Sequence, residues 1–240
     1  MTDPTAPVAV DPGPADDTRP AASSGRGRRV LAAVIAGSLL LAGGLAIGRL
    51  TAGGAATPTT TSAEAGFARD MQTHHQQAVE MAMIIREESD DPAVLSLSYD
   101  IATSQAQQAG QMFGWLASWD LPQASPEPSM TWMTRPALDG DAHDHGADDA
   151  EHVPGEPMPG LATRDQIVEL SEAEGDEADT LFLELMIAHH EGGIEMANAV
   201  LDRSTNPVVL PLARGIVFVQ QGELDYMTEL LERNPGDTAD

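Results

Sequence analysis

The sequence contains no cysteine and no lysine, and aromatic residues make up only 4% of it. Without cysteine, neither a disulfide nor a thiolate metal site can form. All twelve basic residues are arginines. Because aromatic side chains are scarce, the hydrophobic core must consist mainly of Leu, Ile, Val, Ala and Met.

Positive charge is also scarce, and the formal net charge is −26. Thirty-four of the 38 acidic residues lie after Arg49, together with seven of the twelve arginines. Such a surface repels nucleic acid and anionic lipid and concentrates cations near it. It is therefore either a solvated surface that aids solubility or one that gathers cations, and nucleic acid is not an expected partner.

The N-terminal region contains a long apolar run. Residues 1–25 are rich in Pro, Ala and Asp without an apolar period, which predicts a disordered tail. Residues 30–48 are nineteen uncharged residues, enough to cross a hydrocarbon core about 30 Å thick. An arginine cluster precedes this run, at Arg26, Arg28 and Arg29.

Arginines on that flank keep the preceding end in the cytoplasm, so everything after Leu50 is expected outside. The sequence thus predicts a single membrane anchor over residues 26–50, followed by a Thr/Pro-rich linker over residues 51–62. A cleaved signal segment is the alternative, and the protein would then be secreted. The run is longer than a usual signal core and no clean Ala-x-Ala site follows it, which favours the anchor.

One stretch occurs twice. Residues Phe67–Ala82 recur as Phe182–Ala197, at an offset of 115 residues. The offset stays constant along the chain, with matches at Pro92 and Pro207, Ile101 and Ile216, Gln105 and Gln220, Met112 and Met227, and Leu116 and Leu231. A constant register of this length indicates two copies of one structural unit.

Helical periodicity begins near Ala63. At about 100° per residue, one face of this helix combines apolar residues with two histidines. That face consists of Phe67, Met71, His74, His75, Ala78, Met81 and Ala82. Pro92 suits the first turn of a second helix, which Pro122 ends. Its apolar and amide stripe is Ile101, Gln105, Gln108, Met112 and Leu116. Because the gap between them is short, the two helices should form an antiparallel hairpin over residues 63–120.

The second copy follows a proline-rich acidic linker, residues 121–162. Thr163 is expected to cap a brief helix, and the copy proper should run from Asp176 to Arg203, turn at Asn206-Pro207 and end near Arg233. The second hairpin is thus placed at residues 163–233, before a loose tail at 234–240. Neither hairpin can bury its apolar face alone, so the sequence predicts an all-α four-helix bundle over residues 63–233.

The paired histidines are the candidate metal ligands. In each copy a methionine lies one helical turn before the pair: Met71 before His74 and His75, and Met186 before His189 and His190. Imidazole with a thioether suits Cu(I), whereas imidazole alone also suits Cu(II), Zn and Ni. Packing is the competing interpretation, because methionine at helical spacing commonly fills cores and buried histidines are commonly hydrogen-bonded. His143, His145 and His152 of the linker could hold a cation weakly or lie in a flexible loop.

No catalytic site is predicted. Di-iron bundles need a Glu-x-x-His pair on their helices, and the sequence contains none. Glu80 and Glu195 point away from the histidines, and no nucleophile–base set, phosphate loop or basic patch occurs. An enzyme of unknown reaction is therefore the least favoured class.

The doubled His-His-x-x-Ala/Gly-Val/Ile-Glu-Met-Ala motif, with the Gln-x-x-Gln/Glu-x-x-x-Met helix, resembles the bacterial domain of unknown function 305 family. The resemblance covers Ala63 to Arg233 and implies a ferritin-like four-helix bundle. Because certain members bind copper in the periplasm, it also implies a copper ion as ligand. The residues that match the family motif are Met71, His74, His75, Met81, Met186, His189, His190 and Met196. At Met158-Pro-Gly-Leu161 the chain departs from the family, which often has a second methionine there.

Two functions follow from these patterns. The first is a membrane-tethered, extracytoplasmic protein that buffers or transfers copper through paired His and Met ligands. The second is a metal-free bundle that serves as a structural or partner-binding module, with its histidines packed or pH-sensitive. Oligomeric state and the metal's oxidation state do not follow from the sequence.

Overall fold

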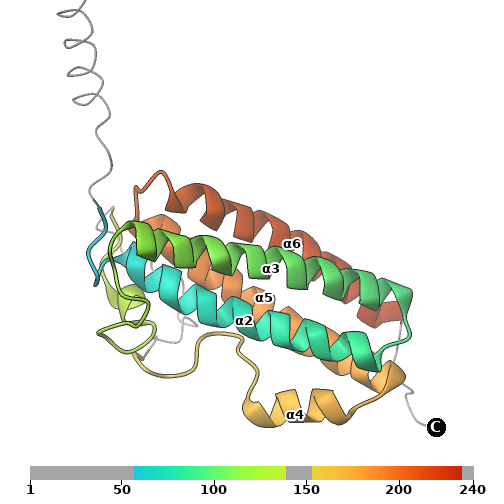
Figure 1. The fold of residues 1–240 in the computed structure, drawn as a ribbon. Coiled ribbons are helices and arrows are strands. Elements are labelled where there is room, and N and C mark those ends of the chain that lie inside the picture. Colours follow the sequence, from blue (N-terminus) through green and yellow to red (C-terminus); the bar gives the residue numbers. More distant parts are fainter. Residues whose placement is uncertain (1–56, 139–152, 234–240) are drawn as a thin grey trace, which may run out of the picture. The chain divides into compact units, whose positions relative to one another are not determined.

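The computed structural model describes residues 57–138 and 153–233, and every regular element within these ranges is helical. Four long helices run alongside one another (Figure 1). They are α2 (Ala63–Glu88), α3 (Pro92–Ser118), α5 (Gly175–Arg203) and α6 (Val209–Arg233). A 3-10 turn, η1 (Thr131–Thr134), and a short helix, α4 (Arg164–Glu172), precede α5. The predicted all-α fold is confirmed.

Capping residues determine where the two helices of the first hairpin begin and end. Ser62 caps α2 by accepting a hydrogen bond from a backbone N–H of the first turn, at 3.3 Å. Ser89 adopts an extended conformation and ends the helix. Asp91 then caps α3 through a 2.6 Å bond from Ala93 N, and Pro92 occupies the first turn as predicted. The three-residue connection makes α2 and α3 antiparallel neighbours.

The second hairpin repeats this turn 115 residues later. Ser204 Oγ accepts from Asn206 N at 3.0 Å, and Asn206 Oδ1 accepts from Val208 N at 2.9 Å. These bonds correspond to those of Ser89 and Asp91 in the first hairpin. The α4 helix begins at Thr163 as expected and has a full capping box. The hairpin itself consists of α5 and α6.

The two hairpins pack mainly through α2 against α5. Two hydrophobic clusters result, and residues that are 115 positions apart lie in opposite clusters. Phe67 and Met71 lie in the first cluster, whereas their counterparts Phe182 and Met186 lie in the second. Further along the same helices the order reverses, because α2 continues into the second cluster and α5 into the first. Both histidine pairs therefore fall between the two clusters.

The described parts of the linker are packed against the bundle. Met130, Trp132, Met133 and Met158 are buried in the first cluster, and nothing corresponds to them in the second copy. Asp70 explains this, since its Oδ2 accepts from Met130 N at 2.8 Å and from Trp132 Nε1 at 2.9 Å. The interpretation of residues 121–162 as a plain linker was thus incomplete.

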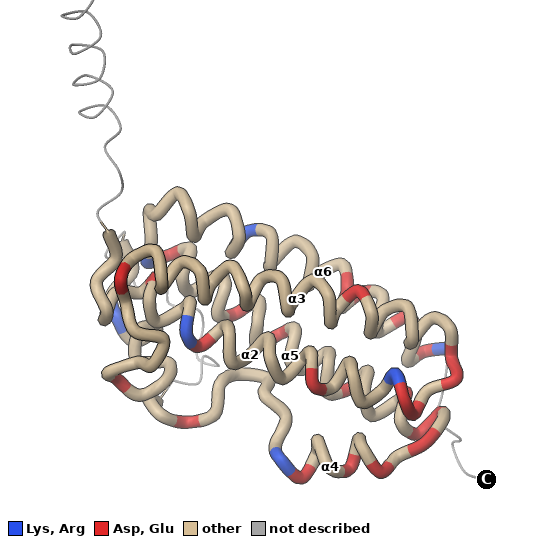
Figure 2. Tube along the Cα trace, in the orientation of Figure 1, with Lys and Arg blue, Asp and Glu red and all other residues tan. Residues whose placement is uncertain are grey.

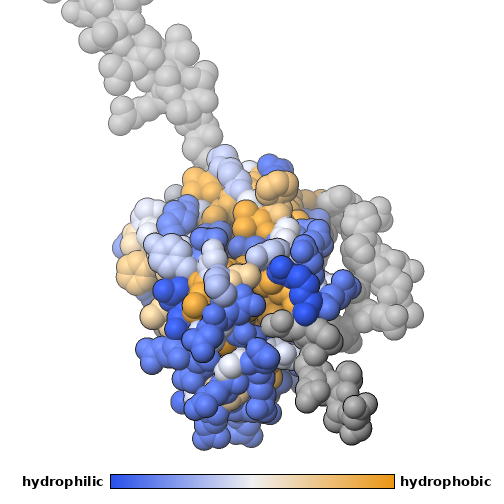
Figure 3. Space-filling model, turned by 90° about the vertical axis from the view of Figure 1, so that its right-hand side faces the viewer, coloured by the Kyte–Doolittle hydropathy of each residue, from blue (hydrophilic) through white to orange (hydrophobic). Residues whose placement is uncertain are grey.

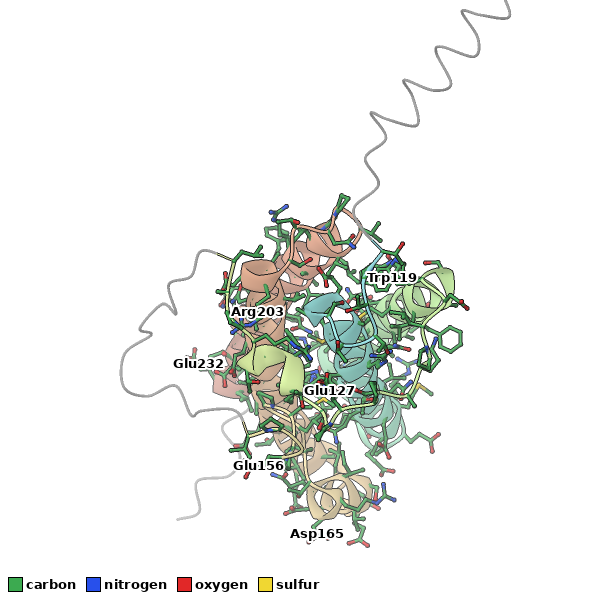
Figure 4. The ribbon with its side chains drawn as sticks, turned by 90° about the vertical axis from the view of Figure 1, so that its left-hand side faces the viewer. Trp119, Glu127, Glu156, Asp165, Arg203 and Glu232 are labelled. Carbon is green, nitrogen blue, oxygen red and sulfur yellow. The ribbon has the colours of Figure 1, made fainter. Side chains whose placement is uncertain are left out.

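Arginines fasten the same end of the bundle. The Arg69 guanidinium donates to Thr60 O at 2.7 Å and to Pro122 O at 2.8 Å. Arg203 donates to Arg135 O at 2.7 Å, and Arg135 pairs with Glu127 at 2.6 Å; Arg203 and Glu127 are labelled in Figure 4. In this way the chain before α2 and the chain after α3 are both tied to the helices.

Acidic residues gather at the opposite end, where α2 turns into α3 and α5 begins (Figure 2). Glu87, Glu88, Asp90 and Asp91 come from that turn, and α5 adds Asp176 and Glu177 to its first turn. Figure 3 views this end, and hydrophilic residues cover most of its lower half. The acidic surface is therefore separate from the buried histidines.

Several predictions concern residues outside the described ranges. These are the tail at 1–25, the anchor at 26–50, residues 51–56 of the 51–62 linker, the linker histidines His143, His145 and His152, and the tail at 234–240. Among the described helices, none is both long and apolar enough to cross a membrane.

Candidate metal site at the histidine layer

Four histidines form a layer across the middle of the bundle, and we call His74, His75, His189 and His190 the histidine layer. α2 supplies the first two and α5 the other two, and all four side chains are fully buried. The rings of His74 and His189 stack at a centroid distance of 3.8 Å with 36° between their planes. Each stands about 6 Å from its chain neighbour, at 6.3 Å for His75 and 6.1 Å for His190. The structure thus brings together the four histidines that the sequence singled out.

Each histidine uses Nε2 to bond an oxygen atom. His74 Nε2 lies 3.1 Å from Pro159 O, and His189 Nε2 lies 2.8 Å from His74 O. The outer pair bond side chains of α3 and α6. His75 Nε2 lies 2.7 Å from Gln108 Oε1, and His190 Nε2 lies 2.8 Å from Glu223 Oε2.

These partners determine the tautomer. Carbonyl and carboxylate oxygens only accept hydrogen bonds, so each Nε2 carries the proton and donates it. Nδ1 of each neutral ring is then an unprotonated lone pair. All four Nδ1 atoms are buried and have no hydrogen-bond partner among the described residues. Histidines that bind metals usually donate their second ring N–H to a carbonyl or carboxylate in this way.

Burial keeps three of the four rings neutral. Loss of solvation lowers the pKa of His74 to about 4 and that of His75 to about 3. Loss of solvation and the neighbouring histidines also lower the pKa of His189 well below 6.5. At neutral pH these lone pairs are therefore free of protons, which is the state in which imidazole binds a metal.

Two buried amides accompany the layer. Gln105 of α3 and Gln220 of α6 are 2% and 3% exposed, and neither amide has a hydrogen-bond partner within the described ranges. They are counterparts at the offset of 115 residues. The interior of the bundle thus holds eight unpartnered polar atoms from six residues, which is a costly arrangement for a purely structural core.

The candidate methionines lie on both sides of the layer. Met71 and Met196 are fully buried in the first cluster, whereas Met81 and Met186 are fully buried in the second. Met112 joins the first set and Met227 the second. Three different long helices therefore each contribute one thioether to each cluster, and the linker adds three more to the first.

A segment of the linker covers the layer, and we call residues 158–162 the strap. Its Pro159 carbonyl is the acceptor for His74, and Ala162 exchanges two bonds with the Gln77 amide, at 2.9 and 2.7 Å. Gly192 of α5 permits this approach, because a Cβ there would lie 2.1 Å from Pro159 O. Gly160 has φ +70°, and a Cβ on it would lie 2.0 Å from Ala188 O.

Sequence reasoning missed the strap as a partner of the histidines. The only signal was the pair Gly160 and Gly192, since glycines at a close backbone approach leave no side-chain pattern. Gln108 was recognised as part of the inward stripe, but its bond to His75 was not expected. The bond of Glu223 to His190 is the equivalent contact in the second copy.

The arrangement is not a preformed multidentate site. Within residues 57–138 and 153–233, no three His, Asp or Glu side chains are placed to hold one metal ion. Metal binding in the layer must therefore draw on the flanking thioethers or on rotated side chains.

Comparisons with known proteins identify relatives. A family model described as "Domain of unknown function (DUF305)" matches residues 64–231. A Streptomyces coelicolor crystal structure, of a protein described as secreted and as DUF305, is 41% identical with a TM-score of 0.64. It covers 76% of this chain and 99% of its own.

Two further structures are similar. A DUF305 fragment from Deinococcus radiodurans is 33% identical with a TM-score of 0.56, and it covers 73% of this chain and 99% of its own. CopM in its Cu(II)-bound form is 21% identical with a TM-score of 0.52, and it covers 72% and 97%. At that identity CopM shows a shared fold alone. No curated protein matches the chain.

Proposed function

We propose that this chain, which belongs to the DUF305 family, binds copper ions in its histidine layer outside the cytoplasm and buffers them or passes them on. The observation that carries the proposal is the set of four buried Nδ1 lone pairs, each fixed by an Nε2–H donor bond. The ligands would be His74, His75, His189 and His190, with Met71, Met81, Met186 and Met196 supplying thioethers.

The ligand chemistry favours copper over harder ions. Buried thioethers and imidazoles are soft to intermediate ligands, and together they suit Cu(I), with Cu(II) accepted by imidazole alone. The absence of cysteine leaves methionine as the only sulfur ligand. CopM, which shares the fold, has been crystallised with Cu(I) and with Cu(II), and this supports the same choice of metal.

The N-terminal sequence and one relative support the proposed location. The arginine cluster and the apolar run at residues 30–48 favour a tether with the bundle outside. The Streptomyces coelicolor relative is described as secreted, which agrees with an extracytoplasmic site. An oxidising compartment would not damage this chain through thiols, because it has none.

A metal-free structural or partner-binding bundle is the alternative. It is favoured by the lack of a three-residue His, Asp or Glu cluster in the described ranges. The stacked His74 and His189 rings also pack well without an ion. On this view the Nδ1 atoms are buried without partners and lower the stability of the core by an amount that the fold tolerates.

Copper-dependent thermal stability separates the two. Binding to the folded state alone should raise the free energy of unfolding by about 2.7 kcal/mol at a copper concentration one hundred times the dissociation constant. Replacement of all four layer histidines by Ala should abolish this gain. Replacement of His143, His145 and His152 by Ala is the matched control and should keep most of it. An unchanged gain in the four-histidine variant would contradict the proposal.

A further inference from the structure

The two copies differ at one polar position of the histidine layer. Gln108 bonds His75 at 2.7 Å, and Glu223 bonds His190 at 2.8 Å. Each partner lies 33 residues after its histidine, and the two partners are counterparts at the offset of 115 residues. The histidines themselves and the buried amides Gln105 and Gln220 are the same in both copies. The layer therefore has a neutral partner at one end and a carboxylate at the other.

This difference acts directly on the outer histidines. A carboxylate that accepts the Nε2–H bond places negative charge near a metal bound at Nδ1. An amide oxygen accepts the same bond without a net charge. His190 is 0% exposed and Glu223 is 17% exposed, so solvent screens the charge only partly.

The stabilisation of an ion by this charge scales with the charge of the ion. A divalent cation gains twice as much electrostatic energy from Glu223 as a monovalent cation at the same place. At His75 the neutral Gln108 gives no such preference, so only the ligand atoms decide there, and imidazole with the methionines of the adjoining clusters suits Cu(I).

We propose that the two ends of the histidine layer are unequal half-sites. The His190 end, backed by Glu223, selects divalent ions such as Cu(II), and the His75 end, backed by Gln108, takes Cu(I). Gln108 and Glu223 act as positioning residues that set this selectivity without touching the metal. The inference rests on the proposed copper function.

Three variants of the full chain test it: Glu223→Gln, Gln108→Glu, and the exchange of both. Glutamine at 223 should fold, because glutamine occupies the equivalent position 108. Cu(II) and Cu(I) affinities are measured by competition with chelators of known affinity. Glu223→Gln should weaken Cu(II) binding about tenfold, the lower end of the effect of such partners on metal affinity. The loss for Cu(I) should be less than about threefold, because Cu(I) binds at the His75 end and even a monovalent ion beside Glu223 would lose only half the energy.

The location of Cu(II) gives the second measurement. A paramagnetic Cu(II) ion broadens the NMR signals of nearby histidines, so substoichiometric Cu(II) should broaden His190 first in the parent chain. In the exchanged variant it should broaden His75 first. Melts of each metal-free variant confirm that the fold is intact.

The outcomes separate this inference from the function on which it rests. Equal losses for Cu(I) and Cu(II), or broadening of both ends alike in the parent chain, would overturn the unequal half-sites while copper binding stands. A parent chain that binds neither ion would overturn both. Selective loss of Cu(II) with migration of the broadening supports the inference.

Discussion

The histidine layer and the linker-covered end of the bundle treat their buried polar atoms in opposite ways. At that end, Asp70 accepts two hydrogen bonds, and the Arg69 guanidinium donates to two carbonyl oxygens. In the layer, the four Nδ1 atoms and the Gln105 and Gln220 amides have no partner among the described residues. The first region stabilises the fold, whereas the second buries polar atoms whose hydrogen-bonding capacity is unused.

The duplication shows the same contrast. The layer is repeated in both hairpins, but Arg69 and Asp70 correspond to Glu184 and Leu185 of the second copy. Only the first copy can therefore bind the linker at that place. The copies thus differ where the linker is bound, whereas the four histidines and the two buried amides are the same in both.

The largest expected effect comes from acid. The pKa of His74 is lowered to about 4 and that of His75 to about 3, from 6.5. Below pH 6.5 these histidines bind protons in the unfolded chain, at pH values where they are still neutral in the folded chain. Stability that is fully present above pH 6.5 is therefore lost as the pH falls. The free energy of unfolding should fall by about 2 kcal/mol for each of these two histidines between pH 6.5 and pH 5. His189, whose pKa is also lowered, should add to this loss.

Urea unfolding at several pH values measures this loss. The variant His75→Gln should reduce the slope, because one titrating group is gone, and the linker variant with His143, His145 and His152 changed to Ala should not. A slope that is the same in the parent chain and in His75→Gln would show that the layer is not buried in its neutral form.

Next in size is the anchoring of the linker by Asp70. Asp70→Leu copies the residue of the second hairpin, but it leaves Met130 N and Trp132 Nε1 without acceptors. The free energy of unfolding should fall by about 3 kcal/mol, as measured by denaturant unfolding. In a Trp132→Phe background the same change should cost less, because one of the two donors is already absent. Equal costs in both backgrounds would mean that the indole bond contributes nothing.

A smaller effect is expected where the strap crosses α5. Gly192→Ala would place a Cβ 2.1 Å from Pro159 O, so the strap must move and the protein should lose about 2 kcal/mol. Gly114→Ala on α3 is the matched control, because a Cβ there meets nothing within 4 Å. That change should instead stabilise by about 0.5–1 kcal/mol through helix propensity. Thermal melts compare the two, and stabilisation by both changes would refute the strap contact.

The smallest effect concerns the buried amides. Gln105→Leu and Gln220→Leu remove polar groups that lack partners, so each should stabilise the metal-free protein by about 1 kcal/mol. Gln107→Leu on the exposed face of α3 should change stability by less than about 0.5 kcal/mol. Destabilisation by both core changes would show that these amides are satisfied in solution.

Much of the bundle followed from the sequence for physical reasons. Apolar spacing predicted both hairpins, and Pro92 and Thr163 predicted where helices begin, since capping chemistry is local. The constant offset placed all four histidines in one core. The strap could not be predicted, because its contact with His74 uses a backbone carbonyl that any residue provides. The histidine tautomers could not be predicted either, because they depend on hydrogen-bond partners from α3, α6 and the linker.

The central claim is that four Nδ1 lone pairs in the layer are free to receive copper. Long-range ¹⁵N–¹H NMR of histidine-labelled protein reports both ring nitrogens, and Cu(I) is diamagnetic and leaves the signals sharp. The metal-free protein should show a proton on Nε2 of all four layer histidines at pH 7, and Cu(I) should shift the Nδ1 signals of the histidines that bind it while Nε2 stays protonated. Protonated Nδ1 atoms in the free protein, or Nδ1 signals that Cu(I) leaves unmoved, would contradict the account.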